Sequence, residues 1–320
     1  MEELTGDVFR NVINRHFGCV DKYFTPFISP DNRIMKTHSR NELERSNNEG
    51  ISVVPQLLTN DAGQFNEAAF LIAGMGYKEI NINFGCPSNT VASKFKGSGI
   101  LRAPEVMDRF LDGVFNKEGS VLREYPDLRI SVKTRVGYND TSDFANVLEI
   151  LNRYPFSEVI VHPRIKKDLY NGIPRMEMFD KACDMLETDI VYNGDIFNAH
   201  DHDEILKRFE EGSNGRYKNV KAVMIGRGAV QNPGIFRQIR DERKMTKDEL
   251  YDFLKDLFET YREDYGEQNA LSKMKEVWSY TVRFIPDEKL RSKTFKAIIK
   301  AKNAGQYNDA ILVAKKDLMI

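Results

Sequence analysis

The chain has 320 residues, a hydrophobic content of 41%, a charged content of 30% and a formal net charge of −1. This length suits one large α/β barrel, alone or with a small appended domain. The charge excludes a globally basic protein, so nucleic acid could be bound only by a local patch. Three scattered cysteines exclude a disulfide framework and a structural metal site, and no apolar run approaches the ~20 residues of a membrane span. With no signal peptide, the sequence predicts a cytoplasmic protein.

Short apolar or β-branched runs recur along the chain, and segments with helical periodicity lie between them. The predicted strands are 19–28, 51–58, 79–84, 129–136, 158–162, 190–193 and 222–225. The predicted helices between them include 62–73, 103–115, 143–152 and 200–209. This alternation predicts a parallel sheet with helices outside it. Because no Gly-rich turn follows the first strand, a TIM (β/α)8-type barrel is favoured over a doubly wound dinucleotide fold.

The two ends of the chain depart from this alternation. The chain begins with a loop and a helix through 7–17, so the first strand of the barrel is expected to be missing from this sequence. From 245 to 320 only helical patterns occur, and the stretch 272–302 is basic. We therefore predict a catalytic barrel at 1–236 and a helical domain at 237–320.

Functional residues of barrels lie at the C-terminal ends of the strands and in the loops that follow. Asn193-Gly194-Asp195 and Gly226-Arg227-Gly228 follow the last two predicted strands, where barrels commonly bind a phosphate. Either turn alone could serve only to make a tight bend. Both at the expected strands favour a phosphate site, to which Arg227 adds a cation.

Two further strand ends suit a flavin. Lys133 ends an apolar strand, and its ammonium would offset the negative charge on the edge of a reduced flavin. The alternative is a lysine that reaches out to solvent. Gln56 could bind the pyrimidine edge of the same ring through its amide.

Cys86 lies between Gly85 and Pro87, directly after a predicted strand. A thiol there can act as a nucleophile or a proton donor, or it can be a small buried apolar group. Its position at the mouth of the barrel, opposite the predicted flavin, favours a functional role. A protonated thiol would act as an acid, whereas a nearby cation would favour the thiolate, and the sequence leaves both open.

Together these segments resemble the tRNA-dihydrouridine synthase family. The matching segments are Asn83-Phe84-Gly85-Cys86-Pro87-Ser88 with Val91 and Lys94, Gly97-Ser98-Gly99-Ile100-Leu101, Ser131-Val132-Lys133-Thr134-Arg135-Val136-Gly137, His162-Pro163-Arg164 with Tyr170-Asn171-Gly172, Asn193-Gly194-Asp195 and Gly226-Arg227-Gly228. They occur in order through nearly the whole barrel, so the combined signal is highly specific although each motif alone is weak.

The resemblance implies reduction of the C5–C6 double bond of particular uridines in tRNA, with FMN as cofactor and NADPH as reductant. It implies that Cys86 is the proton donor and that Asn83 holds the uracil. It places Gln56, Lys133 and His162 around FMN, and it places Asn193, Gly194, Asp195, Gly226 and Arg227 at the phosphate and ribityl end. Arg135, Arg164 and Tyr170 are expected to touch RNA or the target base.

The same resemblance concerns the start of the chain and the helical tail. Family members carry a first strand that ends in Ala-Pro-Met and lines the flavin, and this chain starts at what looks like that methionine, Met1. We favour a misassigned start over a lost strand. Lys273, Lys275 and Arg283, with Trp278 and Tyr280 between them, are expected to grip the tRNA backbone. A merely solvated helix face is the alternative for each cation.

Two other functions remain possible at this stage. One is a flavin barrel that acts on a small metabolite, similar to dihydroorotate dehydrogenase, in which an active-site cysteine serves as base. The basic helical tail argues against it, because a small substrate needs no such surface. The other is a non-enzymatic RNA-binding protein that the missing strand has inactivated. The target uridine, the choice of NADPH over NADH and the oligomeric state cannot be derived from residue types.

Overall fold

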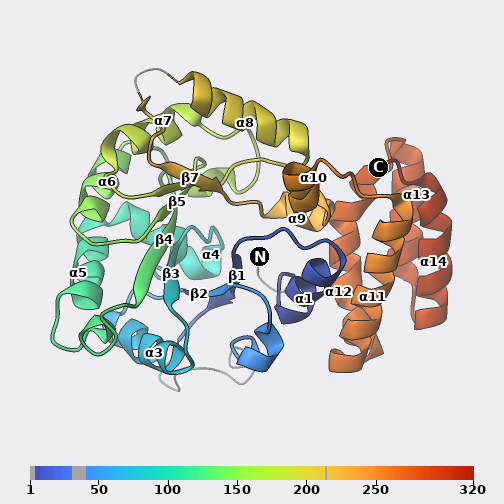
Figure 1. Ribbon diagram of the computed structural model, residues 1–320, viewed down its shortest axis with the longest axis horizontal. Coiled ribbons are helices and arrows are strands. Elements are labelled where there is room, and N and C mark those ends of the chain that lie inside the picture. Colours follow the sequence, from blue (N-terminus) through green and yellow to red (C-terminus); the bar gives the residue numbers. More distant parts are fainter. Residues whose placement is uncertain (1–3, 31–40, 213–214) are drawn as a thin grey trace.

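The computed structural model describes residues 4–30, 41–212 and 215–320. In this part of the chain, seven parallel strands form one sheet in sequence order, which curls as the wall of a barrel (Figure 1). The strands are β1 (Tyr23–Ile28), β2 (Val53–Leu57), β3 (Glu79–Phe84), β4 (Arg129–Arg135), β5 (Val159–His162), β6 (Ile190–Tyr192) and β7 (Val220–Val223). Among the described residues β1 and β7 form the two edges, so the sheet is an incomplete barrel, as expected.

The helices that connect the strands cover the outer face of the sheet (Figure 1). They are α3 (Ala62–Gly74), α5 (Pro104–Phe115), α6 (Phe144–Asn152), α7 (Met176–Met185) and α8 (Ala199–Glu211). Local sequence sets where they begin. The carboxylate of Asp61 caps α3 by accepting a hydrogen bond from the Gln64 amide at 3.0 Å, and α5 begins with Pro104, which is suited to the first helical turn.

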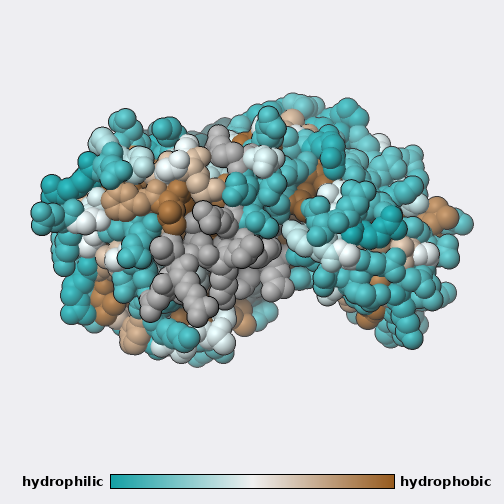
Figure 2. All heavy atoms as spheres, turned by 90° about the horizontal axis from the view of Figure 1, so that it is seen from below, coloured by the Kyte–Doolittle hydropathy of each residue, from teal (hydrophilic) through white to brown (hydrophobic). Residues whose placement is uncertain are grey.

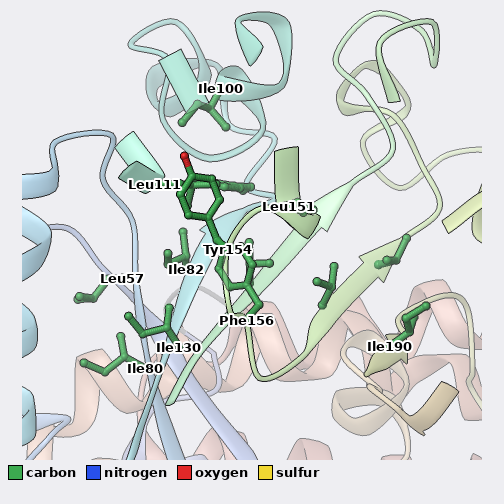
Figure 3. Packing of buried hydrophobic residues seen from close by; sticks show 14 of the residues in the cluster. Leu57, Ile80, Ile82, Ile100, Leu111, Ile130, Leu151, Tyr154, Phe156 and Ile190 are labelled. Atoms are coloured by element: carbon green, nitrogen blue, oxygen red, sulfur yellow. The ribbon is translucent and has the colours of Figure 1, made fainter. Parts of the chain in front are cut away.

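The centre of the sheet is buried on both faces. All six residues of β3 are buried, whereas β7 at the edge exposes Lys221 and Ala222. Figure 3 shows Ile80, Ile82 and Ile130 of β3 and β4 within the hydrophobic cluster between sheet and outer helices. Burial of each such side chain contributes about 1.5–3 kcal/mol. The alternate residues of these strands face inward and line the barrel interior.

The C-terminal part is entirely helical where it is described. It contains α11 (Lys247–Tyr265), α12 (Glu267–Thr281), α13 (Glu288–Lys300) and α14 (Ala304–Asp317). Seen from below, the barrel and these helices form two lobes, and the helical lobe is largely hydrophilic outside (Figure 2). None of the helices in the described residues is long and apolar enough to cross a membrane.

The core of the helical lobe also takes in the N-terminal helix. Helix α1 (Asp7–His16) buries Val8, Phe9, Val12 and Ile13 in the same cluster as α11 and α12. A boundary between residues 236 and 237 falls inside α10 (Ile235–Asp241). Helix α1 therefore packs with the helical lobe, although the predicted domain boundary after residue 236 assigns it to the barrel.

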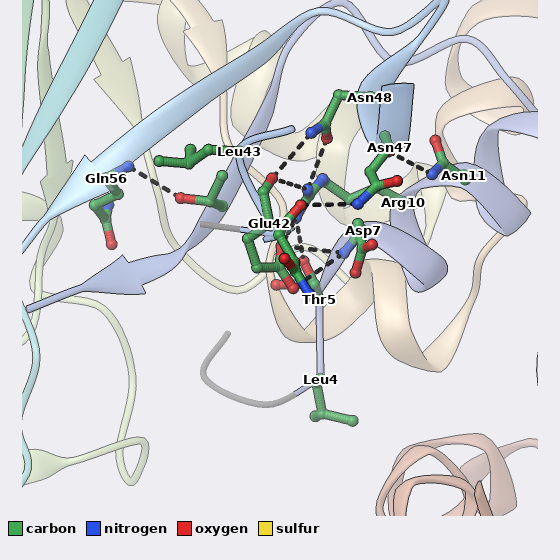
Figure 4. Close-up of polar contacts among 12 residues, drawn as sticks. Leu4, Thr5, Asp7, Arg10, Asn11, Glu42, Leu43, Asn47, Asn48 and Gln56 are labelled. Carbon is green, nitrogen blue, oxygen red and sulfur yellow. Dashed lines mark hydrogen bonds and ion pairs between the residues drawn. The ribbon is translucent and has the colours of Figure 1, made fainter. Parts of the chain in front are cut away.

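A buried polar network ties α1 to the loop after β1 (Figure 4). The Arg10 guanidinium donates to Glu42 Oε2 at 3.0 Å and to Asn48 Oδ1 at 2.8 Å. Burial raises the pKa of Glu42, and the positive charge of Arg10 opposes this shift. Because Arg10 is almost fully buried, these contacts fix how the helical lobe meets the barrel.

Some sequence predictions fail for local reasons. The first strand starts at Tyr23 rather than at residue 19, because Gly18 and Cys19 both have φ near 60°, outside the extended region. The last strand ends at Val223, two residues before the predicted end. The prediction of Trp278 on an RNA-binding surface is wrong, because Trp278 is buried in the helical core and donates to the Tyr307 hydroxyl at 3.1 Å.

Candidate active site

A cavity of about 840 Å³ occupies the barrel interior and opens among the loops at the C-terminal ends of the strands. Its volume lies in the usual range for sites that hold a cofactor. Twelve of the residues predicted from the sequence line it: Gln56, Asn83, Cys86, Lys133, Arg135, His162, Tyr170, Asn193, Gly194, Asp195, Gly226 and Arg227. The parallel topology explains this convergence, because the C-terminal ends of the strands meet at one end of the sheet. Met1 lies outside the described residues.

Polar side chains on the inner face of β2, β3 and β4 form a continuous line of hydrogen bonds, which we call the interior ladder. The Ser131 hydroxyl donates to Glu79 Oε1 at 3.0 Å, and Asn81 Nδ2 donates to Ser131 Oγ at 2.9 Å. Gln56 Nε2 then donates to Asn81 Oδ1 at 2.8 Å, and Asn83 Nδ2 donates to Gln56 Oε1 at 2.6 Å. All five residues are buried, so the bonds provide partners within the protein for polar groups that are largely withdrawn from solvent.

The two ends of the interior ladder fix the orientation of every amide in it. The Glu79 carboxylate, paired with Lys22 and Arg129, can only accept hydrogen bonds. At the other end the backbone N–H groups of Gly85 and Cys86 can only donate, and both donate to Asn83 Oδ1, at 2.9 and 2.8 Å. The hydrogen bonds therefore settle which atom of the Gln56 amide is the nitrogen and which is the oxygen, and so which groups it presents to the cavity.

Backbone contacts hold the loop that carries Cys86 from the other side as well. Arg135 Nε donates to the Gly85 carbonyl at 2.9 Å, and the Ser98 amide and hydroxyl donate to the Cys86 carbonyl at 3.0 and 2.8 Å. Gly97 has φ of 55°, and a Cβ there would lie 2.9 Å from Cys86 Cβ. Only glycine permits this close approach, and the half-buried Cys86 is fixed at the edge of the cavity.

Lys133 and His162 lie on neighbouring strands and share one electrostatic environment. Burial and, to a smaller extent, the positive charge of Arg135 lower the pKa of Lys133 to about 7, and Cys86 opposes the shift. Burial also lowers the pKa of His162 well below its usual value, with the positive charges of Lys133, Arg135, Arg164 and Arg227 adding to the effect. His162 is therefore neutral at pH 7. The Lys133 ammonium makes no ion pair or hydrogen bond to the described residues.

The loops after β6 and β7 approach each other closely. Asn193 Nδ2 donates to the Met224 carbonyl at 2.8 Å, and a Cβ on Gly194 would overlap the Tyr192 hydroxyl. Gly226, in contrast, has open space where its Cβ would lie. Backbone at Gly226 is thus accessible to a ligand in the cavity. Beside it, the Arg227 guanidinium donates to Asp195 Oδ1 at 2.7 Å.

Arg164 points into the protein. Its side chain is fully buried, and it forms a bidentate pair with Asp195 at 2.7 and 2.6 Å. It also donates to the carbonyl groups of Asn171 and Gly172, which fixes the loop that carries Tyr170. The guanidinium of Arg135 is buried too, and it donates to the Ile165 carbonyl at 2.9 Å. The contacts of both arginines suit positioning of loops better than direct contact with RNA.

Tyr170 is the exposed member of this group. Its ring lies 4.5 Å from the Arg227 guanidinium and 5.5 Å from that of Arg135, and it stacks on His162 with centroids 6.4 Å apart. Half of its surface is accessible. Arginine and histidine thus hold an aromatic ring at the mouth of the cavity.

The three predicted cations of the helical lobe do not line the cavity. Lys273 lies over the rings of Tyr261 and Tyr265 at 5.5 and 5.2 Å, Lys275 is half-buried, and Arg283 is exposed and stacks on Tyr280 at 5.9 Å. Helix α12 packs on the short helix α9 (Arg227–Gln231), whose first residue lines the cavity. The helical lobe therefore lies beside the mouth of the cavity.

The residues that sequence reasoning missed are small or act through the backbone. Ser98, Asn81 and Ser131 fix the cysteine loop and the Gln56 amide, and nothing in their side-chain chemistry marks them as functional. A pair between Asp168 and Arg175 braces the loop before Tyr170. In the described residues, no group of three or more His, Cys, Asp or Glu side chains could hold a metal ion.

The model of the dihydrouridine synthase family matches residues 1–316. The chain belongs to this family. A "probable tRNA-dihydrouridine synthase" of Staphylococcus aureus is 29% identical over 275 residues, which cover 82% of this chain and 77% of the relative. The "tRNA-dihydrouridine(16) synthase" of Pseudomonas syringae pv. tomato is 28% identical over 251 residues, which cover 76% of this chain and 74% of the relative.

A solved structure is similar in fold. A variant of NCR from Zymomonas mobilis superimposes with a TM-score of 0.51 at 12% identity, over 79% of this chain and 88% of that protein. At this identity the likeness concerns the barrel architecture alone. The family resemblance inferred from the sequence motifs is confirmed by the family match.

Proposed function

We propose that this member of the dihydrouridine synthase family reduces the C5–C6 double bond of uridines in tRNA, with FMN as cofactor and NADPH as reductant. The observation that carries the proposal is a cysteine, Cys86, fixed at the edge of a cavity that also presents an oriented amide, Gln56, and a half-buried lysine, Lys133. The family match and the names of its relatives support tRNA as the substrate. They also weigh against the small-metabolite alternative.

The cavity fits FMN by the chemistry of its lining. The half-buried Lys133 has no acidic partner among the described residues, and its ammonium suits the electron-rich edge of a reduced flavin. Gln56 keeps one amide hydrogen and one lone pair for the pyrimidine edge of the ring. The open backbone at Gly226 and the guanidinium of Arg227 would hold the phosphate, with Asn193, Gly194 and Asp195 around the ribityl chain. His162, which is neutral, can donate or accept a hydrogen bond there.

When bound, FMN recharged by NADPH supplies the hydride that C6 of the uracil accepts. The chain's own residues then manage the proton. Cys86 Sγ–H donates a proton to C5, which forms the second C–H bond of dihydrouracil, and the thiolate is reprotonated from solvent. The fixed backbone of the Cys86 loop holds the thiol on the side of the cavity where the base would enter.

Asn83 has limited capacity for the uracil. Its Oδ1 already accepts two backbone hydrogen bonds, and one Nδ2 hydrogen is given to Gln56. One amide hydrogen is left for a carbonyl oxygen of the base. Asn83 therefore contributes a single donor to substrate binding, besides its part in shaping the Cys86 loop.

The target uridine must leave the tRNA helix to reach the cavity. Tyr170 at the mouth offers a ring against which a base can stack. Arg283, in the 3-10 turn directly after α12, offers an exposed cation for phosphate, and Lys273 and Lys275 extend the basic surface along α12. Arg135 and Arg164 act by positioning the loops around this mouth.

A comparison of Cys86→Ala with Cys183→Ala tests the proposal. Loss of a general acid lowers the rate about 10²–10⁴-fold, so Cys86→Ala should nearly abolish dihydrouridine formation in tRNA. Its flavin absorbance and its reduction by NADPH should stay at the wild-type level. Cys183 is buried in α7, away from the cavity, and Cys183→Ala should retain normal product formation. Normal turnover by Cys86→Ala would overturn the role of Cys86, and a protein that cannot take up FMN would overturn the flavin mechanism.

A further inference from the structure

A second basic surface lies on the barrel, apart from the helical lobe. It is formed by the loops after β3, β4 and β5, and we call it the rim surface. Its members are Lys94, Phe95, Lys96, Arg102, Tyr138, Lys166 and Lys167. It borders the cavity through Ser88 and Asn89, which line the mouth.

The guanidinium of Arg102 is held between two aromatic rings. It lies 4.1 Å from the ring of Phe95 and 5.0 Å from the ring of Tyr138. Its Nη2 atom donates to the carbonyls of Ser93 and Ala92 at 3.1 and 3.3 Å. The other N–H groups of Arg102 have no acceptor among the described residues, although the side chain is already fixed in place.

Phe95 adopts an uncommon backbone conformation that supports this stack. Its φ is 56°, in the left-handed region that phenylalanine rarely enters, and its side chain is 39% exposed. This uncommon conformation places the aromatic ring at the surface, in contact with Arg102. A strained residue with an exposed ring is more typical of a binding surface than of a packing element.

Lys166 is fixed in a similar way. Its ammonium donates to Asn89 Oδ1 at 2.6 Å and lies 5.2 Å from the ring of Tyr138. In the described part of the chain, none of the five cations of the rim surface forms an ion pair with a carboxylate. The neighbouring Asp168 pairs with Arg175, and Asp140 accepts hydrogen bonds from Ser142. The positive charge of the rim surface is therefore not neutralised within the protein.

The rim surface and the helical lobe border different parts of the mouth. The rim loops follow the middle strands of the sheet, whereas the helical lobe packs on α1 and α9 (Arg227–Gln231), beside the edge strands β1 and β7. Cys86 lies in the same loop as Asn89, and both line the cavity. A chain of phosphates that crosses the mouth would meet cations on both sides.

We propose that the rim surface binds the phosphate backbone of tRNA as a second anchor, on the side of the mouth away from the helical lobe. The inference rests on the proposed function and extends it to a partner site on the barrel. Fixed guanidinium and ammonium groups suit phosphate oxygens, and the interleaved rings of Phe95 and Tyr138 suit unstacked bases. An acidic protein would use the charges but not the rings. Two anchors would hold the backbone while a uridine swings into the cavity.

The test compares two double variants that each remove two positive charges. Arg102→Ala/Lys166→Ala removes the fixed cations of the rim surface. Lys78→Ala/Lys117→Ala removes exposed cations near the opposite, N-terminal ends of β3 and β4. Binding of fluorescently labelled, unfractionated tRNA to the full-length protein is measured from low to moderate salt.

The rim variant should bind tRNA roughly tenfold more weakly at low salt, and its salt slope should fall by about one for each lost phosphate contact. The control variant should match the wild type, and Arg102→Lys should keep the slope because it keeps the charge. A rim variant with wild-type affinity and slope would overturn the inference. Competition by polyglutamate as strong as that by poly(U) would also overturn it, in favour of an acidic protein. Failure of the wild type to bind tRNA would instead overturn the proposed function.

Discussion

The interior ladder and the rim surface use polar residues in opposite ways. Inside the barrel, Gln56, Asn81 and Asn83 have partners within the protein and stand in one fixed orientation. On the rim, Arg102 and Lys166 are fixed by rings and amides, but no carboxylate of the described residues neutralises them. The difference separates two tasks. Groups with protein partners set geometry, and cations without a counter-ion are available to an anionic ligand.

Among polar groups that have partners within the protein, replacement of Arg164 should have the largest effect on stability. Arg164→Met would leave Asp195 with Arg227 alone and remove the donors to Asn171 and Gly172. Loss of one partner of a buried pair costs about 3–5 kcal/mol, and the lower value applies because Asp195 is partly exposed. Urea unfolding measures the change. At the surface pair of Arg208 with Asp180, Arg208→Met should cost less than about 1 kcal/mol, and equal losses would contradict the special place of Arg164.

Asn81→Leu tests the interior ladder. It keeps the size of the side chain but leaves the Gln56 amide and the Ser131 hydroxyl each short of a partner. An orphaned buried group costs about 1–3 kcal/mol in unfolding free energy. Because only Asn83 would still hold the Gln56 amide, FMN affinity measured by flavin fluorescence should fall as well.

Asn66→Leu is the matched control for that change. Asn66 is buried and bonds to Gly113 and Val121, away from the cavity. It should lose similar stability but keep its affinity for FMN. If both variants keep FMN equally well, the interior ladder supports only the fold.

Lys133 should make the unfolding free energy of the protein depend on pH. Its pKa is about 7 in the folded protein and 10.5 in the unfolded chain, so between these values the unfolded chain holds one proton more. The unfolding free energy of the wild type should therefore rise with pH in this window, relative to Lys133→Met, and the difference should be flat below pH 7. Urea unfolding of the flavin-free protein from pH 6 to 10 measures it. A difference between the wild type and Lys133→Met that stays flat from pH 7 to 10 would contradict a lowered pKa of Lys133.

Much of the barrel could be predicted from the sequence because its signals are local. β3 and β4 begin where the apolar runs begin, and parallel strands bring Gln56, Asn83, Lys133 and His162 to one end of the sheet. Gln56 and Lys133 are predicted from their position at a strand end, and Asn83 and His162 from the family resemblance, in each case without knowledge of any contact.

The contacts of the site residues could not be predicted, because they depend on the direction in which each side chain points. Arg135 and Arg164 stand at strand ends, where an arginine can turn toward ligand or protein, and both are buried in contact with backbone carbonyls. Trp278 lies among lysines in the sequence, but its helical spacing from Met274 places it in the core. Ser98 acts through its contacts with the Cys86 carbonyl, which no pattern of residue types reveals. The helical cations Lys273, Lys275 and Arg283 stay a prediction.

The interior ladder also has a consequence for how this sequence can change over time. Its order runs from an acceptor-only carboxylate at Glu79 to donor-only amides at Gly85 and Cys86. Deamidation or mutation of Asn81 to aspartate would keep the acceptor for Gln56 but replace the donor to Ser131 with a second acceptor. Glu79 and the new carboxylate would then compete for the one Ser131 hydroxyl hydrogen. A single altered atom would thus disturb the chain of hydrogen bonds that leads to the Cys86 loop. We therefore expect the residues of the interior ladder to change together in evolution, namely Gln56, Asn81, Asn83 and Ser131.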